Sequence, residues 1–273
     1  MRKFYLLPNS ITAFGLCCGL FVIFKLFLAD PAQDLFALLQ SSTILLLIAG
    51  VADLADGAVA RLVKGESEFG GQFDSLSDAV TFGVASPLVV LSSVPNSELS
   101  PFLALLFTIA AMIYTLCGIL RLVRYNVRSR EATLQEAIVQ KRRYFTGLPI
   151  PTGAALIVSA ALIMVSPFLE NLIVLSAQTR AIIMICVLIL SGYLMVSRWK
   201  FPSVAALHFR VPSFYLVFAI GVFGVLFLYG VLDYFPIAFF LASWTYMTVT
   251  MGFSICRNLF FPPPKVEPQE EEV

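Results

Sequence analysis

The chain has 273 residues, of which 59% are hydrophobic and only 13% are charged, and its formal net charge at pH 7 is +1. Charged residues make up roughly a quarter of an ordinary soluble domain. This composition therefore excludes a soluble globular protein and indicates an integral membrane protein.

Apolar runs close to the ~20 residues that a membrane-spanning helix needs recur along the whole chain. We predict an all-α polytopic membrane protein with about eight transmembrane helices, at residues 10–28, 36–60, 71–95, 101–123, 151–168, 178–197, 213–231 and 235–256. The first run follows Arg2 and Lys3, as a secretory signal would, but it continues through Lys25 without a clear small-residue cleavage site. We interpret it as the first transmembrane helix.

The distribution of Lys and Arg gives the orientation, because these residues concentrate in cytoplasmic loops. With the N-terminus inside, every basic residue except Lys25 and Arg180 lies at or near the cytoplasmic side. The short connections on the other side carry acidic residues instead, among them Asp30, Glu98 and Glu170. We therefore expect both termini and the turn around residue 66 to be cytoplasmic.

Four aspartates lie close together in this apolar chain, and a turn near Glu66 separates them into two pairs. Two antiparallel helices joined at that turn would bring Asp53 level with Asp78 and Asp56 roughly level with Asp74. At 1.5 Å per residue, the four carboxylates lie about 12 to 20 Å from the turn. We expect them to line a recess that opens to the cytoplasm.

Helical periodicity places small residues beside these carboxylates. At 100° per residue, positions 53, 56, 57 and 60 share one face and positions 70, 74 and 78 share another. Gly57, Ala60 and Gly70 remove side-chain bulk there, which would let a flat base or a diphosphate lie against the backbone. The alternative is close helix packing through small residues, which membrane helices use routinely.

Four carboxylates in such a recess repel one another and lose their hydration, so they must protonate, pair with basic groups or hold cations. Only Arg61 and Lys64 are near in sequence. Two divalent ions would neutralise the four charges, and ligation by oxygen alone suits Mg²⁺ or Mn²⁺. Paired ions of this kind clamp a phosphoryl group during a displacement reaction.

The same stretch matches every fixed position of the pattern D-x2-D-G-x2-A-R-x8-G-x3-D-x3-D, through Asp53, Asp56, Gly57, Ala60, Arg61, Gly70, Asp74 and Asp78. This pattern is the signature of the CDP-alcohol phosphotransferase family, which the chain resembles. The resemblance implies a membrane enzyme that displaces CMP from a CDP-linked lipid, with an alcohol as the nucleophile. Family members commonly have six core helices and form homodimers.

The resemblance also implies a role for each matching residue. Asp53, Asp56 and Asp74 correspond to metal ligands, and Asp78 corresponds to a metal ligand that also acts as the base. We expect the contacts to CDP-diacylglycerol at Asn9, Thr12, Gly57, Ala60, Arg61, Ser67 and Gly70. Two of these residues have a second interpretation, because Asn9 and Thr12 would also serve to cap the first helix.

Substrate choice rests on segments outside the signature. Four of them resemble the corresponding segments of bacterial membrane-embedded phosphatidylserine synthases, a branch of the family: residues 6–19, 120–127, 145–151 and 194–203. Arg121 and Arg124 lie three residues apart at the cytoplasmic end of the fourth predicted helix, where either would bind a serine carboxylate. The alternative is that both anchor the helix at the membrane surface.

These observations lead to one prediction of function and two alternatives. The predicted reaction is the transfer of the phosphatidyl group from CDP-diacylglycerol to L-serine, with release of CMP, by two-metal catalysis in a bacterial inner membrane. Glycerol 3-phosphate or an inositol phosphate is the alternative acceptor, and a cation transporter is the alternative class of protein. The expected partners are membrane lipids and a second copy of the chain, without nucleic acid.

We divide the chain accordingly into three parts. Residues 1–200 form the predicted CDP-alcohol phosphotransferase core, and residues 201–257 form two additional transmembrane helices. Residues 258–273 form a cytoplasmic tail that is rich in Pro and Glu and is expected to be disordered.

Overall fold

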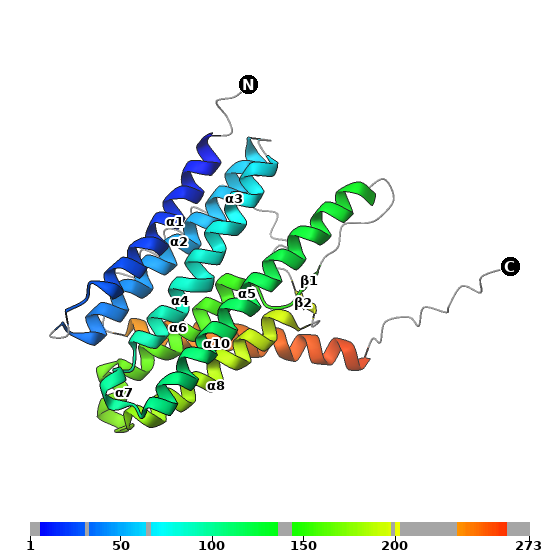
Figure 1. Cartoon of the computed structure of the whole chain (residues 1–273). Helices are drawn as coiled ribbons and strands as arrows, with labels where there is room; N and C mark the ends of the chain where they lie inside the picture. The colour runs from blue at the N-terminus through cyan, green and yellow to red at the C-terminus, as the bar shows by residue number, and fades with distance from the viewer. Residues whose placement is uncertain are drawn as a thin grey trace.

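The computed structural model describes residues 6–30, 33–63, 67–135, 144–197, 200–202 and 234–260. These residues are almost entirely helical, which confirms the predicted all-α polytopic architecture (Figure 1). The elements are α1 (Leu6–Phe27), α2 (Leu35–Leu62), α3 (Glu68–Asp78), the π-helical turn η2 (Ala79–Ala85), α4 (Ser86–Ser92), the 3₁₀ turn η3 (Asn96–Glu98), α5 (Pro101–Gln135), β1 (Tyr144–Thr146), α6 (Ile150–Val165), α7 (Pro167–Leu172), α8 (Ala177–Val196), β2 (Lys200–Pro202) and α10 (Phe235–Phe260).

Within the described residues, fewer helices qualify as membrane spans than the eight that the sequence predicts. Five are long and apolar enough: Leu7–Phe27, Leu35–Ala60, Glu68–Ser92, Pro101–Val127 and Ala177–Val196. The predicted span at 213–231 lies outside the described residues. Residues 151–168 correspond to the shorter apolar helix α6 and to α7.

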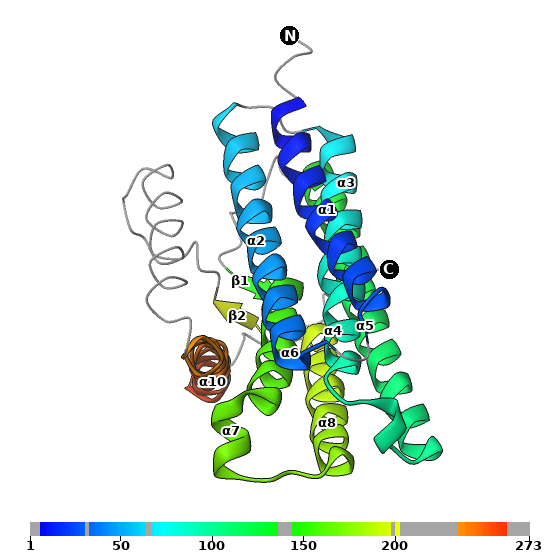
Figure 2. The same cartoon turned by 90° about the vertical axis from the view of Figure 1, so that its left-hand side faces the viewer.

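The last predicted span, residues 235–256, corresponds to α10, which is not one of the five. Figure 2 shows α10 almost end-on, whereas α1 and α2 are seen from the side along their length, so α10 lies across the bundle. It packs against α6 and β2. The sequence predicted its helicity, but an apolar run does not distinguish a helix that crosses the bilayer from one that crosses the bundle.

The helix α6 is the centre of the bundle. It contacts α2, α4, α8, α10 and η2, and most of its side chains are buried, including Leu156, Ile157 and Ala161. Its 16 residues extend only about 24 Å, which is less than the ~30 Å of bilayer hydrocarbon. Because other helices surround α6, its length is set by protein packing rather than by lipid.

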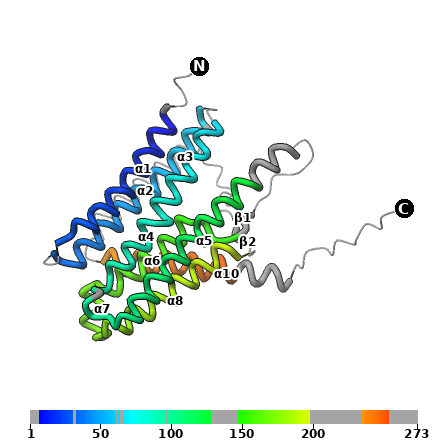
Figure 3. Tube along the Cα trace, in the orientation of Figure 1, coloured from blue at the N-terminus to red at the C-terminus, as the bar shows by residue number. Residues whose placement is uncertain are grey.

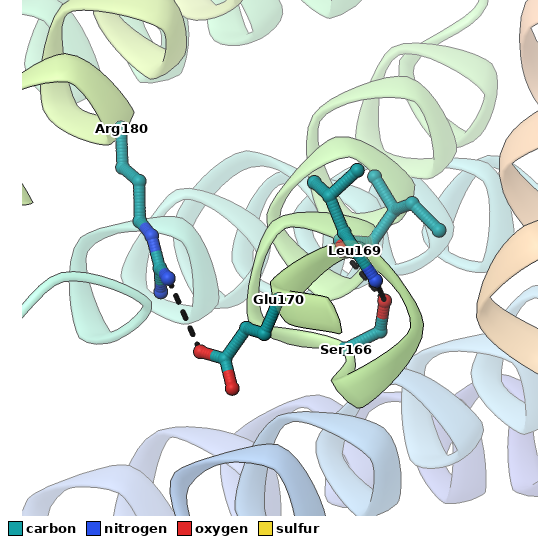
Figure 4. Close-up of polar contacts among 5 residues, drawn as sticks. Ser166, Leu169, Glu170 and Arg180 are labelled. Atoms are coloured by element: carbon teal, nitrogen blue, oxygen red, sulfur yellow. Dashed lines mark hydrogen bonds and ion pairs between the residues drawn. The ribbon is translucent and has the colours of Figure 1, made fainter. Parts of the chain in front are cut away.

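The start of α1, the end of α2 and the start of α3 lie at one end of the bundle, and α7 lies at the opposite end (Figures 1 and 3). At the α7 end, Arg180 donates to Glu170 over 3.1 Å, and Ser166 caps α7 by accepting from the Leu169 N–H (Figure 4). This ion pair balances one of the two basic residues that the charge pattern placed on the far side of the membrane.

A proline explains why the third membrane span is not one regular α-helix. Pro87 has no N–H, and its ring would clash with the carbonyl of Gly83 in α-helical geometry. The backbone widens into the π-helical turn η2 just before this point, between α3 and α4. The turn directly follows Asp78, so it begins beside the predicted site.

A short antiparallel two-stranded sheet joins the segment before α6 to the segment after α8. In it, β1 pairs with β2 from Tyr144↔Pro202 to Thr146↔Lys200. Gly147 follows β1 with φ +85°, a conformation that L side chains rarely adopt, and a Cβ there would lie 2.4 Å from the Met195 carbonyl oxygen. The glycine therefore lets the chain turn tightly against the end of α8.

Candidate functional site

The four aspartates converge in one recess between α1, α2, α3 and η2. Asp53 and Asp56 come from α2, and Asp74 and Asp78 come from α3. The recess is lined by Thr12, Gly15, Ala49, Asp53, Asp56, Asp74, Ser77, Asp78, Thr81 and Phe82. The two aspartate-bearing helix faces that periodicity predicted thus face a common space.

The carboxylates are close enough to act together. Asp53, Asp56 and Asp74 each have an oxygen within 4.8 Å of the others. Asp53 also lies within hydrogen-bonding reach of Asp74 and Asp78, so Asp78 adjoins this group. Asp56 is only 5% exposed, which means that the bundle shields its charge from water.

Thr12 holds one of these carboxylates in place. Its hydroxyl donates to Asp56 Oδ2 and lies 3.1 Å from the Pro8 carbonyl oxygen. Because α1 begins at Leu6, Thr12 lies inside the helix and does not cap it, which corrects one of the two interpretations drawn from the sequence. A side chain that touches an aspartate and lines the recess is part of the site.

The start of α3 approaches α1 through Gly70. A Cβ on Gly70 would lie 3.0 Å from Ser67 Oγ and 3.1 Å from Asn9 Oδ1. Ser67 is the N-cap of α3, and its hydroxyl accepts from the Gly70 N–H over 3.0 Å. Gly70 therefore lets three predicted nucleotide contacts, Asn9, Ser67 and Gly70, come together where α3 meets α1, although Ser67 uses its hydroxyl for capping.

The remaining predicted nucleotide contacts lie on α2. Gly57 and Ala60 are half-buried and follow Asp56 on the same helix. Arg61 belongs to α2, but its side chain lies outside the described part of the structure.

The structure separates the two arginines that the sequence paired. The charge of Arg121 interacts with that of Asp78, and the buried Arg121 Nε has no hydrogen-bond partner among the described residues. Arg124 instead donates from Nη1 to the Val196 carbonyl oxygen at the end of α8, over 2.9 Å. Arg121 faces the site, whereas Arg124 joins α5 to α8 and satisfies a helix-terminal carbonyl.

The donor set of the recess fits a divalent cation. Three carboxylates offer oxygens within 4.8 Å of one another, close to the ~4 Å that separates opposite oxygens around Mg²⁺. Among the described side chains, Arg121 is the one basic group whose charge reaches Asp78. Carboxylate oxygens gathered in this way are suited to hard, oxygen-bound cations.

The deep end of the recess contains residues that the sequence analysis did not identify. Thr81 is 1% exposed, and its Oγ1 has no hydrogen-bond partner among the described residues. A Cβ on Gly19 would lie 2.5 Å from this oxygen, so α1 packs tightly on η2 there. The spacing of Gly15 and Gly19, typical of close helix contacts in membranes, was the available signal.

Fold and site together define a polytopic helical membrane protein with a carboxylate cluster fit to hold divalent cations at one end of its bundle. Residues 5–193 match the model of the CDP-alcohol phosphatidyltransferase family. The chain belongs to this family, and the match covers α1 to α8 almost completely.

Individual relatives carry one name, CDP-diacylglycerol--serine O-phosphatidyltransferase. The Bacillus subtilis protein is 32% identical over 205 residues, which cover 75% of this chain and 91% of that protein. The Helicobacter pylori protein is 30% identical over 219 residues, which cover 80% of both chains. The Mycobacterium leprae protein is 34% identical over 153 residues, which cover 56% of this chain but only 45% of that protein, less than half its length.

We expect Thr12→Val to weaken Mn²⁺ binding by roughly 10-fold, because the variant removes a hydrogen bond to a carboxylate that would hold the metal. Thr12→Ser keeps a hydroxyl and should bind Mn²⁺ almost normally. Thr108→Val is the matched control, since Thr108 is exposed and donates only within its own helix. Titration with Mn²⁺ followed by electron paramagnetic resonance measures the affinity; equal affinities for Thr12→Val and Thr108→Val would contradict this role.

Proposed function

We propose that this protein is a phosphatidylserine synthase, which transfers the phosphatidyl group of CDP-diacylglycerol to the hydroxyl of L-serine and releases CMP. The observation that carries the proposal is the convergence of Asp53, Asp56, Asp74 and Asp78 in one recess of a membrane-embedded bundle. Family membership and the common name of the relatives support the reaction.

Asp53, Asp56, Asp74 and Asp78 would hold two divalent ions, Mg²⁺ or Mn²⁺. When bound, these ions supply positive charge for the diphosphate of the donor substrate and stabilise the charge that develops as CMP leaves. The proposed nucleotide contacts are Asn9, Thr12, Gly57, Ala60, Arg61, Ser67 and Gly70. The small residues among them would leave room for a flat base.

Asp78 is the proposed base. It adjoins Asp53 and its charge interacts with that of Arg121, so both the carboxylate cluster and the guanidinium are near it. The serine hydroxyl oxygen forms a bond to the phosphorus of the phosphatidyl group while its proton passes to Asp78. The bond from that phosphorus to the oxygen bridging the two phosphates breaks, and CMP departs with the bridging oxygen.

Arg121 is the proposed contact for the serine carboxylate. Its buried Nε lacks a partner among the described residues, and an unpaired buried donor is costly unless a ligand satisfies it. A guanidinium binds a carboxylate through two parallel hydrogen bonds. With Arg124 occupied by the Val196 carbonyl, Arg121 is the better candidate of the pair.

The proposed setting is a bacterial inner membrane, with both termini and the recess at the cytoplasmic side. The basic residues gather at that side by sequence, and CDP-diacylglycerol and serine meet where the lipid headgroup reaches water. Residues 1–200 would form the catalytic core, and the protein would work as a homodimer in contact with membrane lipids.

The test of the proposed function uses the purified protein in detergent with CDP-diacylglycerol and Mn²⁺ or Mg²⁺. The acceptors are L-serine, glycerol 3-phosphate and inositol 1-phosphate, each radiolabelled. Of the three acceptors, we expect only L-serine to give a labelled lipid, together with an equal amount of CMP. We expect no product in excess chelator. Product with a phosphorylated acceptor instead would assign a different reaction, and full turnover in chelator would overturn the metal site.

Arg121→Ala should raise the KM for serine by roughly 10- to 150-fold, which corresponds to the free energy of a charge-assisted hydrogen bond. The effect on the KM for CDP-diacylglycerol should be much smaller. Arg124→Ala should instead lower the thermal stability, because it removes the bond between α5 and α8. Steady-state kinetics with both substrates and thermal unfolding in the same detergent separate the two. Equal effects of Arg121→Ala on both KM values would argue against a serine contact.

Asp78→Asn and Asp53→Asn should fail in different ways, although each replaces a carboxylate by an amide of similar shape. An amide cannot accept the serine proton, so Asp78→Asn should lose on the order of 10² to 10⁴ in kcat. Asp53 interacts with both Asp74 and Asp78, so its loss should weaken metal and CDP-diacylglycerol binding together. Metal-dependent binding of CDP-diacylglycerol is measured beside turnover; near-normal turnover of Asp78→Asn would exclude it as the base.

A further inference from the structure

Three successive carbonyls of the π-helical turn η2 are bound by side-chain hydroxyls. Ser86 Oγ donates to the Thr81 carbonyl oxygen over 3.4 Å, within the same span. From α5, Tyr114 donates to the Phe82 carbonyl oxygen over 3.4 Å. These contacts are buried, and Tyr114 is completely buried.

The strongest of the contacts is made by Thr115, whose hydroxyl lies 2.8 Å from the Gly83 carbonyl oxygen and 3.1 Å from the Ala111 carbonyl oxygen of its own helix. These hydrogen bonds compensate for the backbone N–H donor that Pro87 lacks. In an α-helix the N–H of residue 87 would bind the Gly83 carbonyl, and in a π-helix it would bind the Phe82 carbonyl. Pro87 offers neither, and α5 supplies hydroxyls to both acceptors.

The π-helical turn also sets the direction in which α3 faces. A π turn contains about one residue more than an α-helical turn, so it rotates the helix before it relative to the helix after it by roughly 100°. After the turn, α4 buries Val89 and Val90 in the core, which fixes its rotation. Before the turn, α3 presents Asp74 and Asp78 to the recess. Loss of the π geometry would turn these carboxylates away from Asp53 and Asp56.

We propose that Thr115 and Tyr114 are positioning residues of the site: by binding the carbonyls of η2 they hold the π-helical turn and keep Asp74 and Asp78 aimed at the recess. Neither side chain lines the recess. Their effect on cation binding stands on the geometry alone, whereas their effect on turnover rests on the proposed function.

Substitutions in α5 test this role. Thr115→Val removes the hydroxyl with little change of shape, and Thr115→Ser retains it. Tyr114→Phe removes the weaker hydroxyl contact and keeps the buried ring, so it supplies a second variant if Thr115→Val does not fold. Thr108→Val is the control on the same helix, because its hydroxyl binds only the Ala104 carbonyl within α5.

The measurements on the detergent-solubilised full chain are Mn²⁺ affinity by electron paramagnetic resonance, kcat and KM at saturating Mn²⁺, and thermal unfolding. We expect Thr115→Val to weaken Mn²⁺ binding roughly 10-fold and to lower kcat to a similar extent, with the KM for serine changed less than about 2-fold. Tyr114→Phe should act in the same direction with a smaller effect. Thr115→Ser and Thr108→Val should remain within about 2-fold of the unmodified protein.

Two results would overturn the proposal. One is a lower unfolding temperature of Thr115→Val with unchanged Mn²⁺ affinity and kcat, which would make the contact purely structural. The other is a loss of affinity in Thr115→Ser as large as in Thr115→Val, which would exclude the hydroxyl as the cause. If the protein binds Mn²⁺ but makes no lipid product from serine, the proposed function fails while the affinity measurements still decide the positioning role.

Discussion

The mutual repulsion of four carboxylates inside a membrane-embedded bundle is the constraint on which the rest of this structure depends. Two carboxylates 4.8 Å apart repel by roughly 3 to 4 kcal/mol at an effective dielectric constant of about 20. Such a cost for several pairs is comparable to the whole stability of an ordinary domain. The aspartates are therefore tolerable only with bound cations or protons, and the bundle must hold them together rigidly enough that they cannot separate to relieve the repulsion.

Close packing of the helices provides this rigidity. Gly19 lets α1 approach the backbone of η2, and Gly70 lets α3 approach Asn9 of α1. Hydrogen bonds then fix individual groups, as Thr12 does for Asp56. The proline in α4 contributes as well, because the π-helical turn that accommodates it allows α3 to face the recess while α4 packs in the core. Of the small residues that the sequence places beside the aspartates, Gly70 thus serves helix packing.

The sequence predicted the parts of this arrangement that follow regular α-helical periodicity. Spacings of three and four residues placed Asp53 with Asp56 and Asp74 with Asp78 on single faces, and the structure brings those faces together. The π-helical turn was not predicted, because regular α-helical periodicity has 3.6 residues in every turn and a π turn contains more. Helical periodicity also does not indicate that Thr12 binds Asp56, 44 positions away, or that α10 lies across the bundle. These features depend on which helices become neighbours, which single-chain periodicity does not contain.

The segments outside the signature mainly contact other helices of the bundle. This bears on how the proposed reaction would select its acceptor alcohol. Residues 145–151 contain part of β1 and Gly147, which packs against the end of α8. Residues 194–203 contain β2 and the carbonyl that binds Arg124. In residues 120–127, Asn126 exchanges hydrogen bonds with Ser75, next to Asp74. These contacts join α3 to α5 and α5 to α8, so the resemblance in these segments reflects the scaffold as much as the proposed substrate. In the proposed reaction, discrimination among acceptor alcohols would fall to the groups that face the carboxylates, and among the described side chains Arg121 is the cation whose charge reaches Asp78. As the proposed acceptor contact, the Arg121 guanidinium would match the single carboxylate of serine through two parallel hydrogen bonds, whereas the dianionic phosphate of glycerol 3-phosphate would call for a second basic group beside it.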